Sequence, residues 1–499
     1  MMTPREAELT AQVEALTREN ELLRQKLDLL IRRIFGSSSE KLSPDQLELA
    51  LTLATQPAPV ETPAPAPRPA APAPREPRRP RIPENLPVVE EVLEPEAVVA
   101  APEQWRRIGE EVSEQLDYEP GRFLRRRLVR PRYVRKADAE AAPVIAPLPA
   151  RLQERCLATP ALLAQVIVSK YCDHLPLYRQ EQIFATRFGV EIPRQTLSRW
   201  MGLCAGELEP VAKGIRTGVL GGGYVQLDET PIEYLDPGRG RTAEGYLWTC
   251  ARPGGDVFFH WETTRSAECI PRALGADFTG VVQCDGYRAY DSFARTHARP
   301  VRLAACWAHV RRKFHEALKQ SRRAAAYFLG QIQALYQVEA QLRASGAGPT
   351  LRQAERAARS RMIVARLRRM LEHLKPRHLP QSALGLAISY ALSEWEGLTV
   401  YLEDGRVEID NNTVENAIRP TAVGKKNWLF VGDGEAGDRG ATLYTVVESC
   451  RRRGIDPYEY LKDIFTRLPV TLERDRSTLL PENWAKARAG RPTAPTSGA

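Results

Sequence analysis

Residues 223–230 read GYVQLDET, and apolar and polar side chains alternate along them as in a β-strand that ends at a carboxylate. Gln226 and Asp228 fall on one face of this strand, because successive side chains point to opposite faces. Residues 279–287, TGVVQCDGY, repeat the pattern up to Asp285. The sequence therefore predicts two β-strands that each end by presenting a carboxylate.

A third carboxylate comes from Glu415, in residues 409–420 (IDNNTVENAIRP). This stretch predicts a helix with Asp410 or Asn411 as its N-cap. Three convergent carboxylates suit a pair of hard divalent cations such as Mg²⁺ or Mn²⁺, which prefer oxygen ligands. Two such ions about 3.5–4 Å apart stabilise the attacking and leaving oxygens of phosphoryl transfer. The pattern favours the chemistry that cuts and joins DNA.

Both aspartates also have simpler interpretations. Asp285 precedes Gly286, and Asp-Gly is a common dipeptide of β-hairpin turns. Asp228 precedes Glu-Thr-Pro, which fits a loop at the end of a strand. A chain with 62 acidic residues also places carboxylates at strand ends by chance. The pattern alone leaves these alternatives open.

The composition indicates several domains and an anionic partner. The 499 residues are 43% hydrophobic, which is enough for at least one large core. Lys and Arg outnumber Asp and Glu by 71 to 62, and a basic balance favours a polyanion. Residues 121–136 hold eight cations, among them Arg125, Arg126 and Arg127. We expect this run to contact DNA phosphates, with a solvated surface as the alternative.

The eight cysteines are scattered and form no CxxC pair, which indicates free thiols in a reducing compartment. The N-terminus is charged and has no apolar signal region. No run of 18 apolar residues occurs, so we expect no membrane span. These features favour a cytoplasmic protein.

The first part of the chain predicts an association region, a linker and a small β unit. Over residues 5–35 leucines recur every seven residues, and Asn20 interrupts the companion heptad series. This is typical of a parallel coiled coil, so we expect a homodimer or higher oligomer; the alternative is a helix packed on its own protein.

Residues 56–83 are proline-rich and predict an extended linker. Residues 84–150 predict the small β unit.

Residues 155–210 predict a helical DNA-binding region. A helix near 178–188 meets a break at Gly189, and a second helix opens near Pro193. This order is typical of a helix-turn-helix, although many helical hairpins bind nothing. The residues expected to contact DNA are Arg194, Gln195, Thr196, Ser198 and Arg199.

From residue 220 the period changes from helical to strand-like. Three strand patterns form a meander, and alternating strands and helices follow. This order suits a ribonuclease-H-like core over 220–445. Residues 316–400 have helical periodicity and read as an insertion in that core, and 446–490 read as a C-terminal helical region. The expected fold class is multidomain α+β.

Several long motifs also occur in the order known from one protein family. They are FGSSSEKL (35–42), RRIGEEVSEQLDYEPGRF (106–123), VRPRY (129–133), DHLPLYRQEQIF (173–184), PRQTLSRWM (193–201), VQLDETP (225–231), CDGYRAYD (284–291), CWAHVRRKF (306–314), DNNTVENAIRP (410–420), GKKNWLFVGDGEAG (424–437) and LLPENW (479–484). In these motifs the chain resembles transposases of the insertion-sequence-sixty-six family, transposase C type, over nearly its whole length.

The resemblance implies a DDE transposase with Asp228, Asp285 and Glu415 as a triad that binds two Mg²⁺ or Mn²⁺ ions. It implies that the substrates are transposon ends and target DNA. It also implies accessory proteins from the same element and a location in the bacterial cytoplasm, at the nucleoid.

The motifs suggest further site residues. Cys306 and His309 match a CxxH element seen in many DDE families, but two ligands cannot close a zinc site. We therefore expect His309 to organise the active site, with a packed helix residue as the alternative. Lys425 and Lys426 are candidates for holding the DNA backbone. Trp395 or Trp428 would stack on an unpaired base or, alternatively, pack in the core.

One departure from the family concerns a small cysteine-based zinc module around residues 106–133. Residues 84–150 of this chain contain no cysteine, so we expect no zinc there. Two other functions remain as alternatives to a transposase. The first is a DNA-binding regulator without catalysis, and the second is a ribonuclease-H-like nuclease that cuts without joining.

Overall fold

The computed structural model describes residues 149–489, apart from Arg155 and residues 237–240. It also describes a few isolated positions, which are Val13, 121–123, 132–133 and 144–145. The chain divides into two units, one of residues 39–128 and one of the remaining residues. The described residues other than 121–123 belong to the second unit.

Several expected features lie outside the described residues. These are the coiled coil over 5–35, apart from Val13, the linker over 56–83, and Arg125, Arg126 and Arg127. Within the expected β unit, strands β1 (Arg132–Tyr133) and β2 (Val144–Ile145) pair antiparallel.

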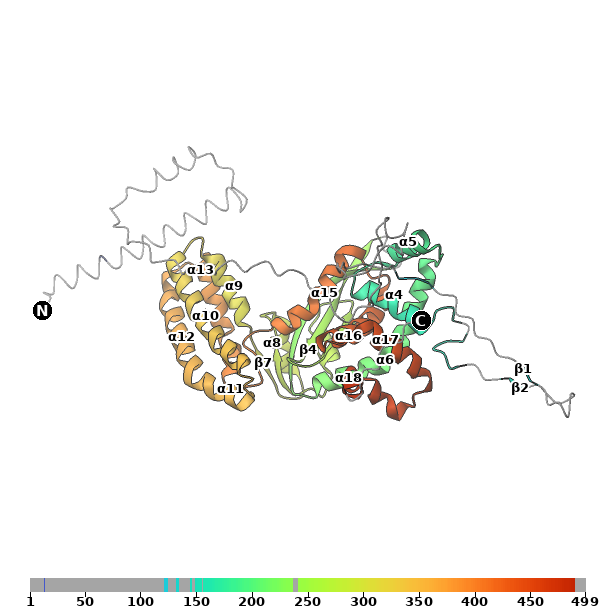
Figure 1. Cartoon of the computed structure of the whole chain (residues 1–499). Coiled ribbons are helices and arrows are strands. Elements are labelled where there is room, and N and C mark those ends of the chain that lie inside the picture. The colour runs from blue at the N-terminus through green and yellow to red at the C-terminus, as the bar shows by residue number, and fades with distance from the viewer. Residues whose placement is uncertain are drawn as a thin grey trace, which may run out of the picture. The chain divides into compact units, whose positions relative to one another are not determined.

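A five-stranded mixed sheet is the centre of the described fold (Figure 1). Its strands are β3 (Tyr224–Leu235), β4 (Thr242–Ala251), β5 (Val257–Glu262), β6 (Gly280–Gln283) and β7 (Val301–Ala304). The spatial order is β5-β4-β3-β6-β7. The first three strands form the expected antiparallel meander, whereas β6 runs parallel to β3 and β7 parallel to β6.

Parallel pairing requires a crossover between strands, and short helices provide it. Helix α7 (Cys269–Leu274) precedes β6, and α8 (Arg288–Thr296) joins β6 to β7. Asp285 and Gly286 lie between β6 and α8, at the start of such a crossover. The hairpin-turn interpretation of this dipeptide is therefore wrong, because β6 pairs with no antiparallel neighbour.

Helix α16 (Gly434–Arg452) covers the edge of the sheet at β5. The amide of Phe259 donates to Thr445 Oγ1 at 2.9 Å, and Ser449 Oγ donates to the carbonyl of Val257 at 2.9 Å. Side chains of the helix thus bind backbone groups of the edge strand, which protects that edge from pairing with another chain. Helix α16 begins within the region predicted as the core and continues past residue 446.

The helices that precede the sheet match the predicted helical region. They are α4 (Pro160–Tyr171), α5 (Leu177–Phe188) and α6 (Arg194–Leu220). Gly189 ends α5 with φ of 64°, a left-handed conformation that glycine adopts without steric cost. Helix α6 begins directly after Pro193, as expected, but it is 27 residues long, and buried apolar side chains recur along one face of it up to Val219.

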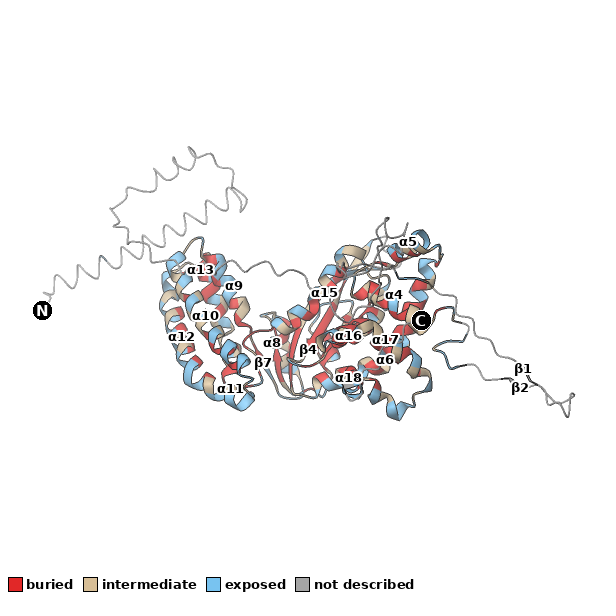
Figure 2. Ribbon diagram, in the orientation of Figure 1, coloured by how far each residue is buried: buried red, intermediate tan, exposed pale blue. Residues whose placement is uncertain are grey.

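A second group of helices lies between β7 and Glu415 in the sequence (Figure 1). It consists of α9 (Trp307–Ala317), α10 (Arg322–Ala344), α11 (Pro349–Glu355), a π-helical turn (Arg356–Ser360), α12 (Arg361–Leu374), α13 (Ala383–Ser393) and α14 (Trp395–Thr399). Buried residues line the facing sides of α9, α10, α12 and α13 (Figure 2). Phe314 and Phe328 stack at 4.3 Å within this core, which is continuous with Ala304 of β7.

The remaining helices are α15 (Asn412–Trp428), α17 (Pro457–Arg467) and α18 (Pro481–Ala489). Short 3₁₀ turns occur at Lys375–Arg377, Val400–Leu402, Leu468–Val470 and Glu473–Leu479. None of the helices in the described part of the chain is long and apolar enough to cross a membrane. The fold is mixed α+β, as expected.

Candidate active site

The structure brings the three predicted carboxylates together beside β3. Asp228 lies within β3, Asp285 follows the parallel neighbour β6, and Glu415 lies in the first turn of α15. Because β3 continues to Leu235, the prediction that this strand ends at Asp228 is wrong, and so is the loop interpretation of the Glu-Thr-Pro that follows. The charges of Asp285 and Glu415 both act on the carboxyl group of Asp228. Residues that are 57 and 130 positions apart in the sequence therefore share one acidic site.

The surroundings of Asp228 destabilise the ionised form of its carboxyl group. Burial, followed by the charges of Glu229, Asp285 and Glu415, raises the pKa of Asp228 to about 8. Burial removes the water that would stabilise the carboxylate, and like charges nearby add to that cost. A cation bound among these groups would reverse both effects, because it would stabilise the ionised form.

A buried amide network fixes the start of α15 to the sheet. Gln226 Nε2 donates to Gln283 Oε1 at 2.9 Å and to the carbonyl of Asp410 at 2.8 Å. Gln226 Oε1 accepts from the amide of Val414 at 3.1 Å. Gln226 and Gln283 are fully buried, so these hydrogen bonds are shielded from water. The residue before Glu415 is thereby tied to the strand that carries Asp228.

Tyr224 completes this network on the same strand face. Its hydroxyl donates to Gln283 Oε1 at 2.6 Å and accepts from the amide of Glu408 at 2.9 Å. Gln283 Nε2 donates to the carbonyl of Glu408 at 2.9 Å. The sequence places these side chains on shared strand faces but does not reveal their function. The signal that could have found it is a glutamine two residues before each aspartate in an otherwise apolar strand.

The N-cap of α15 is Asn411, one of the two expected positions, but its side chain makes no capping hydrogen bond. The carboxylate of Asp410 instead accepts from the amide of Asn412 at 3.2 Å. The cap position and the capping side chain therefore belong to neighbouring residues.

His309 lies beside the acidic site. Its Nε2 atom is 3.4 Å from Glu415 Oε1, and the imidazole comes from the first turn of α9. Burial lowers the pKa of His309, and nearby Arg312 lowers it further, against the opposing charge of Glu415. Cys306, the other half of the CxxH element, is the N-cap of α9 and is buried, and burial raises the pKa of its thiol.

A fourth carboxylate, Glu229, lies next to Asp228, and the sequence analysis missed it. Its side chain is 2% exposed and accepts from Arg265 Nε at 2.7 Å and from the hydroxyl of Tyr290 at 2.8 Å. The amide of Glu229 donates to Asp228 Oδ1 at 3.0 Å. Its position directly after Asp228 was the available sequence signal.

The donor chemistry of this site fits divalent cations, because carboxylate oxygens are the ligands that Mg²⁺ and Mn²⁺ prefer. Burial, followed by the charges of neighbouring carboxylates, raises the pKa of Asp228, and a bound cation would offset both causes. Over the described residues, however, no three His, Cys, Asp or Glu side chains are already placed as the ligands of one metal ion. The carboxylates approach one another without forming a closed ligand set.

The residues predicted to contact DNA at the start of α6 form an accessible surface. Arg194, Gln195, Ser198 and Arg199 are exposed, and Thr196 is half-buried. The amide of Arg194 donates to Glu181 Oε1 of α5 at 3.1 Å, which joins the two helices. The first turn of α6 thus presents polar and basic side chains.

The two predicted lysines near the end of α15 differ. Lys425 Nζ donates to Thr230 Oγ1 at 3.2 Å and to the carbonyl of Pro231 at 2.9 Å, so its ammonium group is held by β3. Lys426 is exposed. Both tryptophans pack against other side chains. Trp428 lies 6.3 Å from the ring of Tyr171, and Trp395 lies 6.1 Å from that of Trp307.

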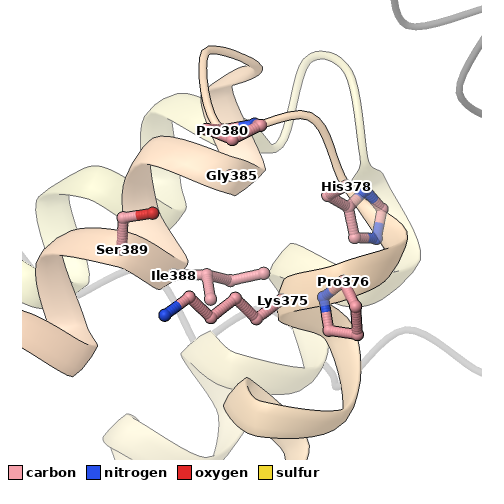
Figure 3. A pocket seen from close by; sticks show the side chains of 7 residues that line it. All are labelled: Lys375, Pro376, His378, Pro380, Gly385, Ile388 and Ser389. Atoms are coloured by element: carbon pink, nitrogen blue, oxygen red, sulfur yellow. The ribbon is translucent and has the colours of Figure 1, made fainter.

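A cavity of about 310 Å³ lies between the end of α12 and α13 (Figure 3). The residues that line it are Lys375, Pro376, His378, Pro380, Gly385, Ile388 and Ser389. None of the acidic residues described above lines this cavity, so it is distinct from the candidate active site.

Comparison with known proteins assigns the chain to a family. Residues 155–439 match the family described as "Transposase IS66 family", and residues 445–481 match the "IS66 C-terminal element". The chain belongs to the IS66 family of transposases. Residues 22–90 also match a family described as "Transposase C of IS166 homeodomain". The resemblance seen in the sequence motifs is therefore confirmed.

The chain is also similar to proteins of Sinorhizobium fredii. It is 37% identical to the uncharacterized protein y4jD over 513 aligned positions, which cover 98% of this chain and 99% of the relative. It is 38% identical to the uncharacterized protein y4qI over 80% of this chain and 76% of the relative. For the uncharacterized protein y4hP the identity is 30%, over 94% of this chain and 89% of the relative. The similarity to y4jD thus extends over nearly the whole chain.

Proposed function

We propose that this IS66 family transposase is a DDE enzyme that cleaves DNA at the ends of its element and joins the ends to target DNA. The observation that carries the proposal is the convergence of Asp228, Asp285 and Glu415 beside β3. The sheet order, with three antiparallel strands followed by two parallel ones, supports a ribonuclease-H-like core. The helical segment 316–400 is then an insertion in that core.

Asp228, Asp285 and Glu415 would hold two Mg²⁺ or Mn²⁺ ions, with no zinc required. When bound, such ions stabilise the attacking and leaving oxygens of the phosphodiester. The protein positions the carboxylates through the buried network of Gln226, Gln283 and Tyr224. This fixed geometry is the contribution that phosphoryl transfer requires of the protein.

His309 orients Glu415 in this proposal. Its Nε2 atom lies 3.4 Å from the Glu415 carboxylate, close enough to bias the rotamer of that side chain. Burial lowers the pKa of His309, which favours the neutral imidazole over a cation that would compete with metal ions for Glu415.

DNA is bound at sites outside the acidic cluster. The exposed first turn of α6 would read or track the duplex as the second helix of a helix-turn-helix. The basic run 121–136 and Lys426 would contact phosphates. The heptads over 5–35 would pair two protomers, so that both ends of the element are held together in the cytoplasm at the nucleoid. Accessory proteins of the same element would assist.

A cleavage and joining assay tests the proposal. Duplex DNA from the ends of the encoding element is incubated with Mg²⁺ or Mn²⁺ and with wild type, Asp285→Asn or Asp277→Asn. Asp277 is the matched control, because its side chain is 95% exposed. We expect metal-dependent 3′-hydroxyl ends and joined products, lost in Asp285→Asn and retained in Asp277→Asn.

Three outcomes would contradict the proposal. Binding without cleavage by wild type, with the accessory proteins of the element present, would indicate a DNA-binding regulator. Cleavage without joined products would indicate a nuclease. Cleavage that survives Asp285→Asn would place the catalytic centre elsewhere in the chain.

A further inference from the structure

Arg265 is a cation held beside the acidic site by the carboxylate that the sequence analysis missed. It lies in the loop between β5 and α7. Its Nε atom donates to Glu229 Oε1 at 2.7 Å, and its Nη2 atom lies 2.5 Å from the same oxygen. Glu229 follows Asp228 in β3, and the charge of Asp285 acts on the Arg265 guanidinium, so this ion pair holds the guanidinium near the carboxylates of the site.

Tyr287 fixes the orientation of the guanidinium. The Arg265 guanidinium carbon lies 4.0 Å from the centroid of the Tyr287 ring, a cation–π contact. The Tyr287 hydroxyl donates to the backbone carbonyl of Arg265 at 2.9 Å. The Tyr287 amide donates to Asp285 Oδ1 at 3.0 Å. One residue therefore holds both Arg265 and the second aspartate of the site.

The two partners of this ion pair differ in exposure. The Glu229 side chain is 2% exposed, whereas the Arg265 side chain is 42% exposed. A guanidinium has five N–H donors in a planar fork, and one edge of it satisfies Glu229. The N–H groups of the other edge remain for a further acceptor. A planar fork matches the two oxygens of a phosphate.

We propose that Arg265 binds a phosphate of the DNA strand that is cut, through the guanidinium edge that does not face Glu229. This inference rests on the proposed function, because it requires DNA in the acidic site. Glu229 and Tyr287 then act as positioning residues that hold the fork in a fixed direction. Arg265 provides positive charge where the carboxylates would otherwise repel the phosphate.

The matched control is a second arginine of the same region. Arg272 in α7 donates through Nε and Nη2 to Glu262, at 2.6 and 3.0 Å, and its side chain is 50% exposed. The hydrogen bonds and charge of Glu262 raise the pKa of Arg272. Arg272→Ala therefore removes an arginine of similar exposure that is paired with Glu262 and not with Glu229.

The first experiment measures the salt dependence of binding to duplex DNA from the element ends. The logarithm of the binding constant falls linearly with the logarithm of salt concentration, by about 0.9 for each phosphate contact. We expect Arg265→Ala to reduce this slope by about one, and Arg272→Ala to leave it unchanged. Equal slopes for wild type and Arg265→Ala would overturn the inference.

The second experiment measures cleavage by the same variants. We expect kcat/KM to fall on the order of 100-fold in Arg265→Ala, as when a preorganised donor to the reacting group is removed. Arg265→Lys keeps the charge but loses the fork, so it should keep the salt slope and lose most of the cleavage rate. Cleavage by Arg265→Lys at the wild-type rate would show that the fork has no function.

Two further variants separate the possible failures. Because Arg265→Ala leaves Glu229 unpaired and buried, the double variant Arg265→Ala, Glu229→Gln is measured beside it, and it should show the same reduced slope. Asp228→Asn tests the proposed function independently. If Asp228→Asn abolishes cleavage but both Arg265→Ala proteins cleave and bind as wild type does, the inference is wrong and the proposed function stands.

If wild type does not cleave even with the accessory proteins of the element present, the proposed function is contradicted. The salt slope of binding still decides whether Arg265 contacts a phosphate.

Discussion

Two buried polar networks meet at the segment that precedes Glu415, and they differ in charge. The first, in the sheet, consists of the neutral side chains Tyr224, Gln226 and Gln283. The second, in the helical segment, is ionic and is built around Arg356. Both bind residues of 401–414, so both bear on the position of Glu415.

The ionic network joins a fully buried arginine to several charged and backbone partners. Arg356 is fully buried and donates to both oxygens of Glu339, at 2.7 and 2.8 Å, and to the carbonyl of Tyr401 at 2.7 Å. Arg352 forms ion pairs with two carboxylates: its Nη2 atom lies 3.1 Å from Glu339 Oε2, and its Nη1 atom lies 2.7 Å from Glu408 Oε1. Arg356 opens a π-helical turn, a feature often found at functional sites.

Glu408 connects the two networks. Its carboxylate accepts from Arg352, while its backbone amide and carbonyl bind Tyr224 and Gln283. The difference between the networks shows two ways to fix one segment. Burying a hydrogen-bonded neutral amide costs little free energy, and its hydrogen bonds fix the direction of the segment. Burying a charge costs more, and removing one partner of a buried ion pair strongly destabilises the protein.

The largest expected effect comes from breaking the ionic network. Arg356→Ala leaves the carboxylate of Glu339 buried with a weakened set of partners, so we expect the free energy of unfolding to fall by about 3–5 kcal/mol. Urea denaturation followed by tryptophan fluorescence measures it. Arg359→Ala is the control, since its pair with Glu355 is exposed at 3.6 Å and should contribute less than about 1 kcal/mol.

A double variant tests whether charge itself causes that loss. Replacing both partners, with Glu339→Leu and Arg356→Met, removes the unpaired buried charge, and we expect it to be more stable than Arg356→Ala. If the double variant is the less stable of the two, the loss in Arg356→Ala reflects packing, and the contrast between the networks fails.

The next effect comes from the neutral network. Gln226→Ala removes the partner of the Val414 amide and of the Asp410 carbonyl, so we expect a loss on the order of 2 kcal/mol. We also expect faster hydrogen exchange of the Val414 amide and a loss of DNA cleavage larger than the loss of stability explains. Unchanged exchange at Val414 would show that Gln226 does not hold the start of α15.

A smaller effect is expected for Tyr224→Phe. This change removes one hydroxyl, which donates to Gln283 and accepts from the Glu408 amide. We expect a loss of about 1 kcal/mol in the free energy of unfolding, because the ring and its packing remain. A loss as large as that of Arg356→Ala would erase the distinction between the two networks.

The last prediction concerns the pH dependence of stability, which distinguishes the ionic network from the neutral one. Burial alone would raise the pKa of Glu339, but the hydrogen bonds and charges of Arg356 and Arg352 hold it below its usual value of 4.5. The stability from this ionisation is therefore present above pH 4.5 and is lost as pH falls through the lower folded-state pKa. The slope for one proton is at most about 1.4 kcal/mol per pH unit.

Denaturation as a function of pH checks this expectation. Below pH 4.5, wild type and Gln226→Ala should lose stability in parallel, because Gln226 does not titrate. The double variant Glu339→Leu, Arg356→Met should show a shallower loss. If the free energy of unfolding falls with the same slope below pH 4.5 in all three proteins, Glu339 does not titrate in this range.

Much of the fold follows from local patterns in the sequence. The alternation in GYVQLDET and TGVVQCDGY predicts β3 and β6, and the helical periodicity of 316–400 predicts the helices found there. The family motifs lead to Asp228, Asp285 and Glu415. The hairpin-turn interpretation of Asp285 fails because the strand neighbours of β6 are set by distant residues.

The sequence by itself determined most of the strands and helices, because each depends on side chains a few positions apart, and its family motifs pointed to the three acidic residues. The tertiary structure decided what those residues touch. Gln226 reaches Val414 across 188 positions, and Arg265 reaches Glu229 across 36. Such pairings depend on the strand order and on how α15 packs against β3, which no local pattern encodes. The burial that raises the pKa of Asp228 likewise exists only once these elements have packed together.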